Sequence, residues 1–75
     1  MSGGGTGTIV FWKLERGFGF IEPDASNRRE DNVFFIYRAL KGLEQWAINP
    51  GTRVRFEIEP GGDRGRVRAR LVMPE

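Results

Sequence analysis

The segment from Arg16 to Ile21 reads Arg-Gly-Phe-Gly-Phe-Ile, and it restricts the possible folds more than any other part of the sequence. Successive side chains of a β-strand point to opposite faces. Phe18 and Phe20 therefore share one face with the arginine, and the other face carries only glycine and isoleucine. Glycine inside a strand usually marks a tight bend or a close approach of two backbones. An inner face this thin suits a small, strongly curved barrel that leaves both rings outside.

Outward rings beside a cation are what a single-stranded nucleic acid needs, because bases stack on the rings and the cation meets a phosphate. The competing interpretation is that Phe18, Phe20 and Phe34 pack in the core. The alternation opposes it, because Ile21 and Phe35 already occupy the inner face of their strands. We therefore expect these three rings to be exposed and to stack on bases, with the arginine of the motif as a phosphate contact.

The chain has 75 residues, enough for one small domain with a single core. It contains no cysteine and no histidine. This excludes disulfides, thiolate zinc sites and histidine-based catalysis, and it favours a reducing, cytoplasmic location. Asp24, Glu30, Asp31 and Asp63 lie in loops or turns beside arginines, without a set of groups suited to a metal or to catalysis. No apolar run approaches the ~20 residues of a membrane span. We expect no enzymatic activity, no metal, no cofactor and no membrane contact.

Short runs of β-branched and aromatic residues, separated by turn residues, predict five strands. Their ranges are 7–13, 18–22, 32–37, 52–59 and 64–72. Residues 1–6 are rich in glycine and predict a flexible tail, and residues 7–73 form one domain. The stretch 38–49 lacks strand alternation and is expected to be a long loop with room for one helical turn. Five short strands of this kind indicate a small antiparallel barrel.

The last predicted strand combines an apolar face with a basic one. Val67, Ala69 and Leu71 are expected to face inward. The other face carries Arg64, Arg66, Arg68 and Arg70. Glu57 and Glu59 would lie opposite this row across a hairpin, so a ladder of cross-strand ion pairs explains part of it. The surplus arginines are candidates for an extension of a nucleic-acid binding track.

Taken in order and at their spacing, these motifs resemble the cold-shock domain family, whose members are OB-type barrels that bind single-stranded RNA and DNA. The resemblance covers residues 7–72. Gly-Thr-Ile-Val-Phe-Trp-Lys at 7–13 is similar to the family's Gly-Thr-Val-Lys-Trp-Phe-Asn, and Arg16 to Ile21 resembles its first ribonucleoprotein-type motif. Asn-Val-Phe-Phe-Ile-Tyr at 32–37 resembles the second motif, Asp-Val-Phe-Val-His-Phe, and residues 51–57 resemble Gly-x-x-Val-x-Phe-Glu.

The sequence departs from the family's pattern at several positions of the site that the resemblance implies. The Trp-Phe pair of the family is inverted to Phe11 and Trp12. Phe11 stands at the position of the main stacking tryptophan, so we favour it as the ligand contact and expect Trp12 to lie partly in the core. Val10 stands in place of a lysine and Ile36 in place of a stacking histidine. Both changes make the platform less polar.

Two further aromatic residues have different expected roles. For Tyr37, stacking on a base and closing the end of the barrel are equally supported. Gln45 stands where the family has a phenylalanine in the long loop, and Trp46 follows it. We expect Trp46 to be a hydrophobic plug of its own loop rather than a ligand contact.

The sequence thus predicts an all-β protein, a five-stranded antiparallel OB-fold barrel, that binds single-stranded RNA or DNA by base stacking and by arginine and lysine contacts to the backbone. The expected binding residues are Phe11, Trp12, Lys13, Arg16, Phe18, Phe20, Phe34, Ile36 and Tyr37. The resemblance implies a monomeric RNA chaperone or a regulator of transcription or translation. The alternative is a small barrel whose aromatic patch contacts another protein, which the missing histidine and lysine favour.

Overall fold

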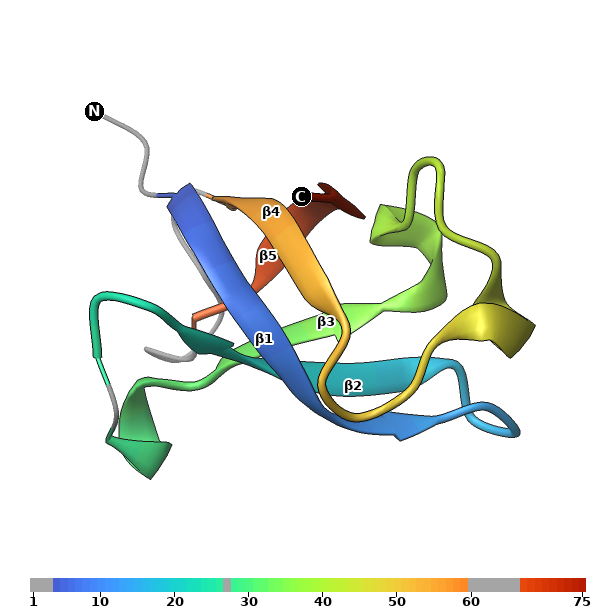
Figure 1. Ribbon diagram of the computed structural model, residues 1–75, viewed down its shortest axis with the longest axis horizontal. Helices are drawn as coiled ribbons and strands as arrows, with labels where there is room; N and C mark the ends of the chain where they lie inside the picture. Colours follow the sequence, from blue (N-terminus) through green and yellow to red (C-terminus); the bar gives the residue numbers. More distant parts are fainter. Residues whose placement is uncertain (1–3, 27, 60–66) are drawn as a thin grey trace.

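The computed structural model describes residues 4–26, 28–59 and 67–75 of the chain. Five strands make up the fold, as predicted (Figure 1), and the described residues contain no α-helix. The strands are β1 (Gly4–Lys13), β2 (Phe18–Pro23), β3 (Val33–Ile36), β4 (Arg53–Ile58) and β5 (Ala69–Pro74). Three single 3₁₀ turns lie between β2 and β4, namely η1 (Arg29–Asp31), η2 (Tyr37–Ala39) and η3 (Gln45–Ala47).

The strands form one antiparallel sheet in the order β3-β2-β1-β4-β5. The sheet curls until its two outer strands approach each other (Figure 1). At this closure Phe34 of β3 forms a parallel bridge with Arg68, which directly precedes β5. The N–H of Phe34 donates a hydrogen bond of 3.1 Å to the carbonyl oxygen of Val67. The arrangement is the barrel of OB type that the sequence predicts.

The first strand begins earlier than predicted. Gly4 lies opposite Glu57 and Thr6 lies opposite Arg55, so residues 4–6 pair with β4 and are part of the sheet rather than of a tail. The prediction missed this pairing because glycine has a low strand propensity, whereas the partner strand supplies the hydrogen bonds that hold these residues. Residues 1–3 of the predicted tail lie outside the described part of the chain.

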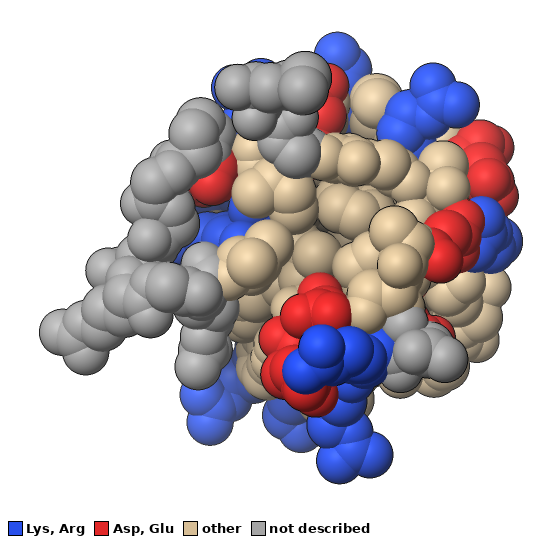
Figure 2. Space-filling view, turned by 90° about the vertical axis from the view of Figure 1, so that its left-hand side faces the viewer, with Lys and Arg blue, Asp and Glu red and all other residues tan. Residues whose placement is uncertain are grey.

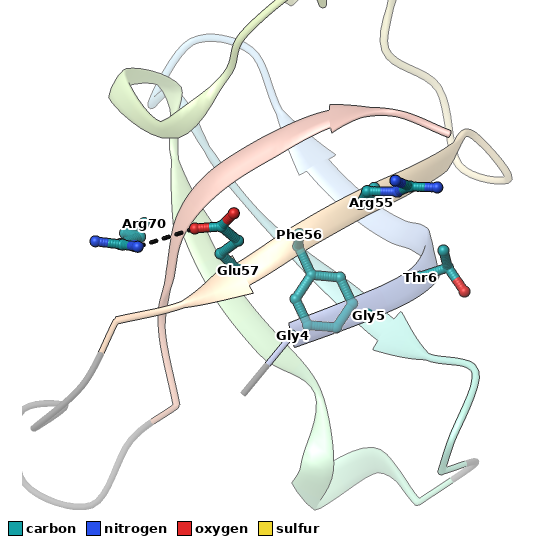
Figure 3. Close-up of a pocket in the computed structure, with 7 residues that line it drawn as sticks. All are labelled: Gly4, Gly5, Thr6, Arg55, Phe56, Glu57 and Arg70. Carbon is teal, nitrogen blue, oxygen red and sulfur yellow. Dashed lines mark hydrogen bonds and ion pairs between the residues drawn. The ribbon is translucent and has the colours of Figure 1, made fainter. Parts of the chain in front are cut away.

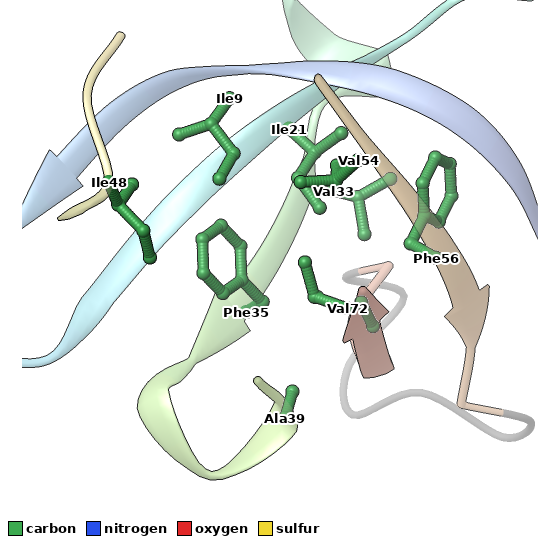
Figure 4. Close-up of a cluster of buried hydrophobic side chains, with 10 residues drawn as sticks. Ile9, Ile21, Val33, Phe35, Ala39, Ile48, Val54, Phe56 and Val72 are labelled. Carbon is green, nitrogen blue, oxygen red and sulfur yellow. The ribbon is translucent and has the colours of Figure 1, made fainter. Parts of the chain in front are cut away.

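The core lies inside the curled sheet and is made of apolar side chains from all five strands (Figure 4). Phe35 is its largest fully buried member. The buried residues are Ile9, Ile21, Val33, Phe35, Ala39, Ile48, Val54, Phe56, Ala69 and Val72. Gly19 is also buried, as the motif predicts. A Cβ added to Gly19 would collide with the carbonyl oxygen of Phe11 and would lie 3.0 Å from Phe35. The glycine therefore lets β1 and β2 curve tightly around the core.

The inward face of β5 differs from the prediction. Ala69 is buried as expected, but Val67 is 41% exposed and Leu71 is only half-buried, while Val72 is fully buried. A bulge explains the positions of Leu71 and Val72, because Glu57 lies opposite Leu71 and Ile58 lies opposite Ala69. The residue between them has no partner, and from there on the alternation of β5 is reversed.

An exposed polar network ties the C-terminal end of the chain to β4. The Arg53 guanidinium donates hydrogen bonds of 2.6 Å to Asp24, 2.9 Å to Glu75 and 2.9 Å to Thr8. Hydrogen bonds from Arg53 and Thr6 hold the pKa of Asp24 well below its usual range, and Arg53 also lowers the pKa of Glu75. One cation thus links the ends of β2, β4 and β5.

No helix in the described ranges is long and apolar enough to cross a membrane.

Candidate nucleic-acid interface

A bulge in β1 decides which ring of the Phe11–Trp12 pair faces outward. Ile9 lies opposite Ile21, but Phe11 lies opposite Phe20, so Val10 is an extra residue on β1. Because of this residue, Phe11 points to the same face as Phe20 instead of following Ile9 into the core. Phe11 is 43% exposed and Val10 is 41% exposed. The preference for Phe11 as the outward ring agrees with this geometry.

Four phenylalanine rings gather on the outer face of the three neighbouring strands β1, β2 and β3. We call this cluster the aromatic platform, and it consists of Phe11, Phe18, Phe20 and Phe34. Phe18 and Phe20 lie at its centre, and each of them contacts the other three rings. All five ring contacts have centroid distances between 5.7 and 6.2 Å. These values fall in the range of favourable aromatic pairs, so the rings hold one another in place while their outer sides stay accessible.

Trp12 lies on the core side of the sheet, apart from the platform. Its ring stacks on Phe35 with a centroid distance of 5.5 Å and an interplanar angle of 4°. The indole N–H donates a hydrogen bond of 3.1 Å to the carbonyl oxygen of Gln45, which ties the long loop to β1. Trp12 is half-buried against the core. The structure therefore separates this predicted site residue from the other rings and gives it a supporting position beneath them.

Ile36 and Tyr37 lie at the far end of β3. Ile36 is half-buried and lies opposite Phe18, so it borders the platform. Tyr37 is 44% exposed, and its N–H donates a hydrogen bond of 2.7 Å to the carbonyl oxygen of Gly17. Gly17 has φ +70°, and a Cβ there would lie 2.9 Å from the Tyr37 ring. Glycine is therefore needed at this turn both for its backbone conformation and for its contact with the tyrosine.

The two predicted cations, Lys13 and Arg16, are exposed on the turn that joins β1 to β2. The N–H of Arg16 and the N–H of Gly17 both donate to the carbonyl oxygen of Lys13, at 3.2 and 2.8 Å. Lys13 lies opposite Phe18 in the sheet, and Arg16 precedes Phe18 by two residues in the chain. A shallow hollow of about 160 Å³ lies here, lined by Leu14, Glu15, Arg16, Gly17, Tyr37 and Gln45.

The expectation that Trp46 plugs its loop is wrong, because its side chain is 75% exposed. Trp46 occupies the middle of the single turn η3. The neighbouring Ile48 is buried and Leu43 packs against the core, so these two side chains anchor the loop and the tryptophan points away from them. The exposure of Trp46 could have been predicted from its spacing to Leu43 and Ile48. A short loop with a single turn cannot bury all three of these side chains on one side.

The arginines predicted to form one row on the last strand have different neighbours in the structure. Arg70 forms an ion pair of 3.0 Å with Glu57, which confirms that part of the predicted ladder. Arg68 instead lies over the platform, with its guanidinium carbon 5.8 Å from the Phe34 ring centroid. Arg64 and Arg66 lie outside the described residues.

A second hollow, of about 640 Å³, lies over the first half of β1 and over β4 (Figure 3). Two glycines of β1 leave this surface open, and the Arg70–Glu57 pair borders it. Its lining residues are Gly4, Gly5, Thr6, Arg55, Phe56, Glu57 and Arg70. None of the predicted binding residues is among them. The platform and this hollow are therefore separate surfaces.

Charges of both signs lie side by side on the face that Figure 2 shows, around a largely uncharged centre. The net charge is only +2. Electrostatic attraction of a polyanion must therefore come from local groups such as Lys13 and Arg16. Within the described ranges, no group of three or more acidic residues is placed to hold a metal ion.

Comparison with known proteins gives one consistent family. A model of the 'Cold-shock' DNA-binding domain matches residues 5–74. The Cold shock-like protein CspG of Escherichia coli (strain K12) is 35% identical over 72 residues, which are 96% of this chain and 97% of that protein. The Cold shock-like protein CspLB of Listeria monocytogenes is 38% identical over 56 residues, 75% of this chain and 79% of that protein. Glycine-rich protein 2 of Nicotiana sylvestris is 33% identical over 63 residues, 84% of this chain and 28% of that protein.

Proposed function

This chain belongs to the cold-shock domain family, and we propose that it binds single-stranded RNA or DNA by stacking bases on its aromatic platform. Cold-shock domain proteins bind single-stranded nucleic acids. The observation that carries the proposal for this chain is the platform itself, four phenylalanine rings joined by five contacts of 5.7 to 6.2 Å on the outer face of three strands. Aromatic rings that keep an open side on the outer face of a sheet mark an interaction site, and nucleic-acid bases can stack on them.

Stacking supplies most of the affinity in this proposal. Each base that stacks on an aromatic side chain contributes about 1–3 kcal/mol, and every base has a flat face to offer. The proposed stacking residues are Phe11, Phe18, Phe20 and Phe34, with Ile36 and Tyr37 as contacts at the edge. These side chains can contact only bases that are not already paired and stacked within a duplex, so they favour single-stranded nucleic acid. We therefore infer little sequence preference and strong discrimination against duplexes.

Lys13 and Arg16 are the proposed contacts to the phosphate backbone. Both side chains are exposed at the end of the platform where Phe18 lies. A cation in this place neutralises a phosphate next to a stacked base and releases a counterion. Because the platform has few cations, its salt dependence should be shallow, with a log–log slope of about −0.7 for each phosphate contact.

The cellular role we propose is that of an RNA chaperone with effects on transcription or translation. Rings occupied by splayed bases stabilise the unpaired strand relative to the duplex, so binding alone shifts the equilibrium toward open RNA. The reaction needs no catalysis, and members of the family are nucleic-acid-binding proteins rather than enzymes. We further propose a monomer that acts in the cytoplasm.

One observation favours a second function, docking of a protein partner. The exposed apolar area extends beyond the four rings, because Val10, Leu14 and Trp46 are 41%, 50% and 75% exposed. Exposed apolar surface of this kind also suits a protein interface. Salt separates the two functions, since apolar docking responds little to ionic strength, whereas phosphate contacts weaken as salt rises.

The proposal is tested by a titration of a fluorescently labelled pyrimidine heptamer, as RNA and as DNA, at two salt concentrations. The same strand annealed to its complement is the control. We expect the single strand to bind, the duplex to bind far more weakly, and the affinity to fall with salt. If neither single strand binds at low salt, the proposed function is wrong and the protein-docking alternative gains support.

A further inference from the structure

The strand pairing places three rings and one arginine in a single row across the outer face of the barrel. Phe11 lies opposite Phe20, Phe20 lies opposite Phe34, and Phe34 forms the parallel bridge with Arg68. Neighbouring strands are about 4.8 Å apart. The row therefore crosses from β1 through β2 and β3 to the start of β5, with Arg68 as its last member. No sequence alternation could have indicated this, because the contact forms only where the barrel closes.

The backbone holds Arg68 firmly at this position. The N–H of Phe34 donates a hydrogen bond of 3.1 Å to the carbonyl oxygen of Val67. This bond fixes Val67, the residue before Arg68, to β3. The N–H of Glu59, which follows β4, donates a hydrogen bond of 2.8 Å to the carbonyl oxygen of Arg68. This bond fixes Arg68 to the end of β4. Arg68 is half-buried between these neighbours. Its guanidinium group thus reaches the Phe34 ring from a fixed base rather than from a flexible loop.

Arg68 also differs from the nearest arginine in its charge balance. Arg70, two residues further on, is neutralised by the Glu57 carboxylate at 3.0 Å. Among the described residues, no carboxylate lies within ion-pairing distance of Arg68. Its guanidinium group lies over the face of Phe34, with the guanidinium carbon 5.8 Å from the ring centroid. A cation held over an aromatic ring keeps its hydrogen-bond donors free for an anion.

We propose that Arg68 is a nucleic-acid contact that extends the aromatic platform across the barrel closure onto the fifth strand. This inference rests on the proposed function and assigns a further residue to the same interface. A base that stacks on Phe34 also contacts the flat face of the Arg68 guanidinium group. The N–H donors of the guanidinium group then bind the next phosphate of the strand. The bound strand therefore has a cation at each end of the platform, Arg16 at one end and Arg68 at the other.

Arg68 could also affect binding in the opposite direction, by covering Phe34 and competing with a base for the ring. Removal of Arg68 would then strengthen binding. The contact distance of 5.8 Å argues against this, because it leaves the ring partly open. Phe34 is only half-buried, although it also contacts Phe18 and Phe20. The sign of the change in affinity thus separates contact from competition.

The experiment compares Arg68→Gln with Arg70→Gln in the full chain. Both variants lose one positive charge from the same strand, and both keep a long polar side chain that preserves packing. The labelled pyrimidine heptamer is titrated at four or more salt concentrations. For Arg68→Gln we expect about fivefold weaker binding at low salt and a log–log salt slope that is shallower by about 0.7, the loss of one phosphate contact. For Arg70→Gln we expect the slope of the wild type.

Arg68→Lys gives a second, independent measurement. It keeps the charge but not the flat guanidinium group, so the salt slope should stay at the wild-type value while the affinity falls by a smaller factor. Equal affinity and equal slope for the wild type and Arg68→Gln would overturn the inference, as would tighter binding. The proposed function stands in that case if Phe20→Ala still weakens binding by at least about fivefold. If the wild type itself binds no single strand, the failure lies with the proposed function.

Discussion

Phe11 of β1 lies directly opposite Phe20 of β2, with 6.2 Å between their ring centroids, although Ile9 lies opposite Ile21. Plain alternation would have placed Phe11 in the core behind Ile9. The extra residue Val10 turns the ring outward, and it also turns Trp12 inward onto Phe35. A single bulge therefore places one neighbouring ring on the outer face of the sheet and the other on the core side beneath it.

The first prediction separates binding from stability by comparing two phenylalanines. Phe20→Ala removes a half-buried ring from the centre of the platform, and we expect a loss of about 1–3 kcal/mol in binding, roughly 5- to 150-fold in affinity. Phe35→Ala removes a fully buried ring and should cost about 3–5 kcal/mol of the free energy of unfolding. Oligonucleotide titration and denaturant unfolding of both variants check this. A Phe20→Ala variant with unchanged affinity would contradict the stacking mechanism.

Gly19→Ala tests the close approach of β1 and β2. The added methyl group would collide with the carbonyl oxygen of Phe11 and press on Trp12 and Phe35. Overpacking of this kind typically costs about 1–3 kcal/mol of stability, here through backbone atoms that have little room to move. Thermal unfolding measures the effect. An unchanged melting temperature would show that the strands have more freedom at this point than the structure indicates.

Stability should fall in acid through the Arg53 network. Hydrogen bonds from Arg53 lower the pKa of Asp24 and of Glu75 in the folded state. A carboxylate with a lowered folded-state pKa stabilises the fold above its unfolded pKa, about 4, and this contribution is lost as the pH falls through the folded-state value. We therefore expect the free energy of unfolding to decline below about pH 5, and Asp24→Asn to flatten that decline.

Denaturant unfolding between pH 7 and pH 3 at low and high salt is the measurement for the Arg53 network. All three groups are exposed, so salt should weaken the effect. Glu44→Gln serves as the control, because Glu44 is an exposed acid and no described residue forms an ion pair with it. If Asp24→Asn and Glu44→Gln give the same acid profile, the network does not stabilise the fold.

The two tryptophans should be distinguishable by fluorescence. Trp46 is 75% exposed, whereas Trp12 is stacked on Phe35 and hydrogen-bonded to Gln45. We expect Trp46→Phe to remove the red-shifted emission that acrylamide quenches readily, and to change the free energy of unfolding by less than ~0.5 kcal/mol. Spectra with and without acrylamide check this. Readily quenched emission that persists in the variant would mean that Trp12 is the exposed ring.

The sequence was sufficient for those parts of the fold and site that depend on alternation. The outward position of Phe18 and Phe20 follows from the glycines between and before them, and the buried Ile21 and Phe35 follow from the same pattern. The five strands followed from their turn residues. These features are local, and local pattern is what a sequence expresses most directly.

Features that depend on pairing between strands were beyond the sequence. A bulge at Arg70 reverses the alternation of β5, so Leu71 is only half-buried and Val72 is buried. Residues 4–6 join the sheet because β4 lies beside them. The position of Arg68 over Phe34 arises only when the curled sheet brings β3 and β5 together. Each of these outcomes is set by a partner distant in the sequence.

Backbone and aromatic side-chain NMR of the labelled protein, titrated with an unlabelled pyrimidine heptamer, tests the central claim most directly. We expect the largest shifts on the ring resonances of Phe11, Phe18, Phe20 and Phe34, with smaller shifts along the turn at Lys13 to Arg16. Shifts confined to the hollow beside Gly4 and Arg55, or no shifts at all at a saturating concentration, would contradict it.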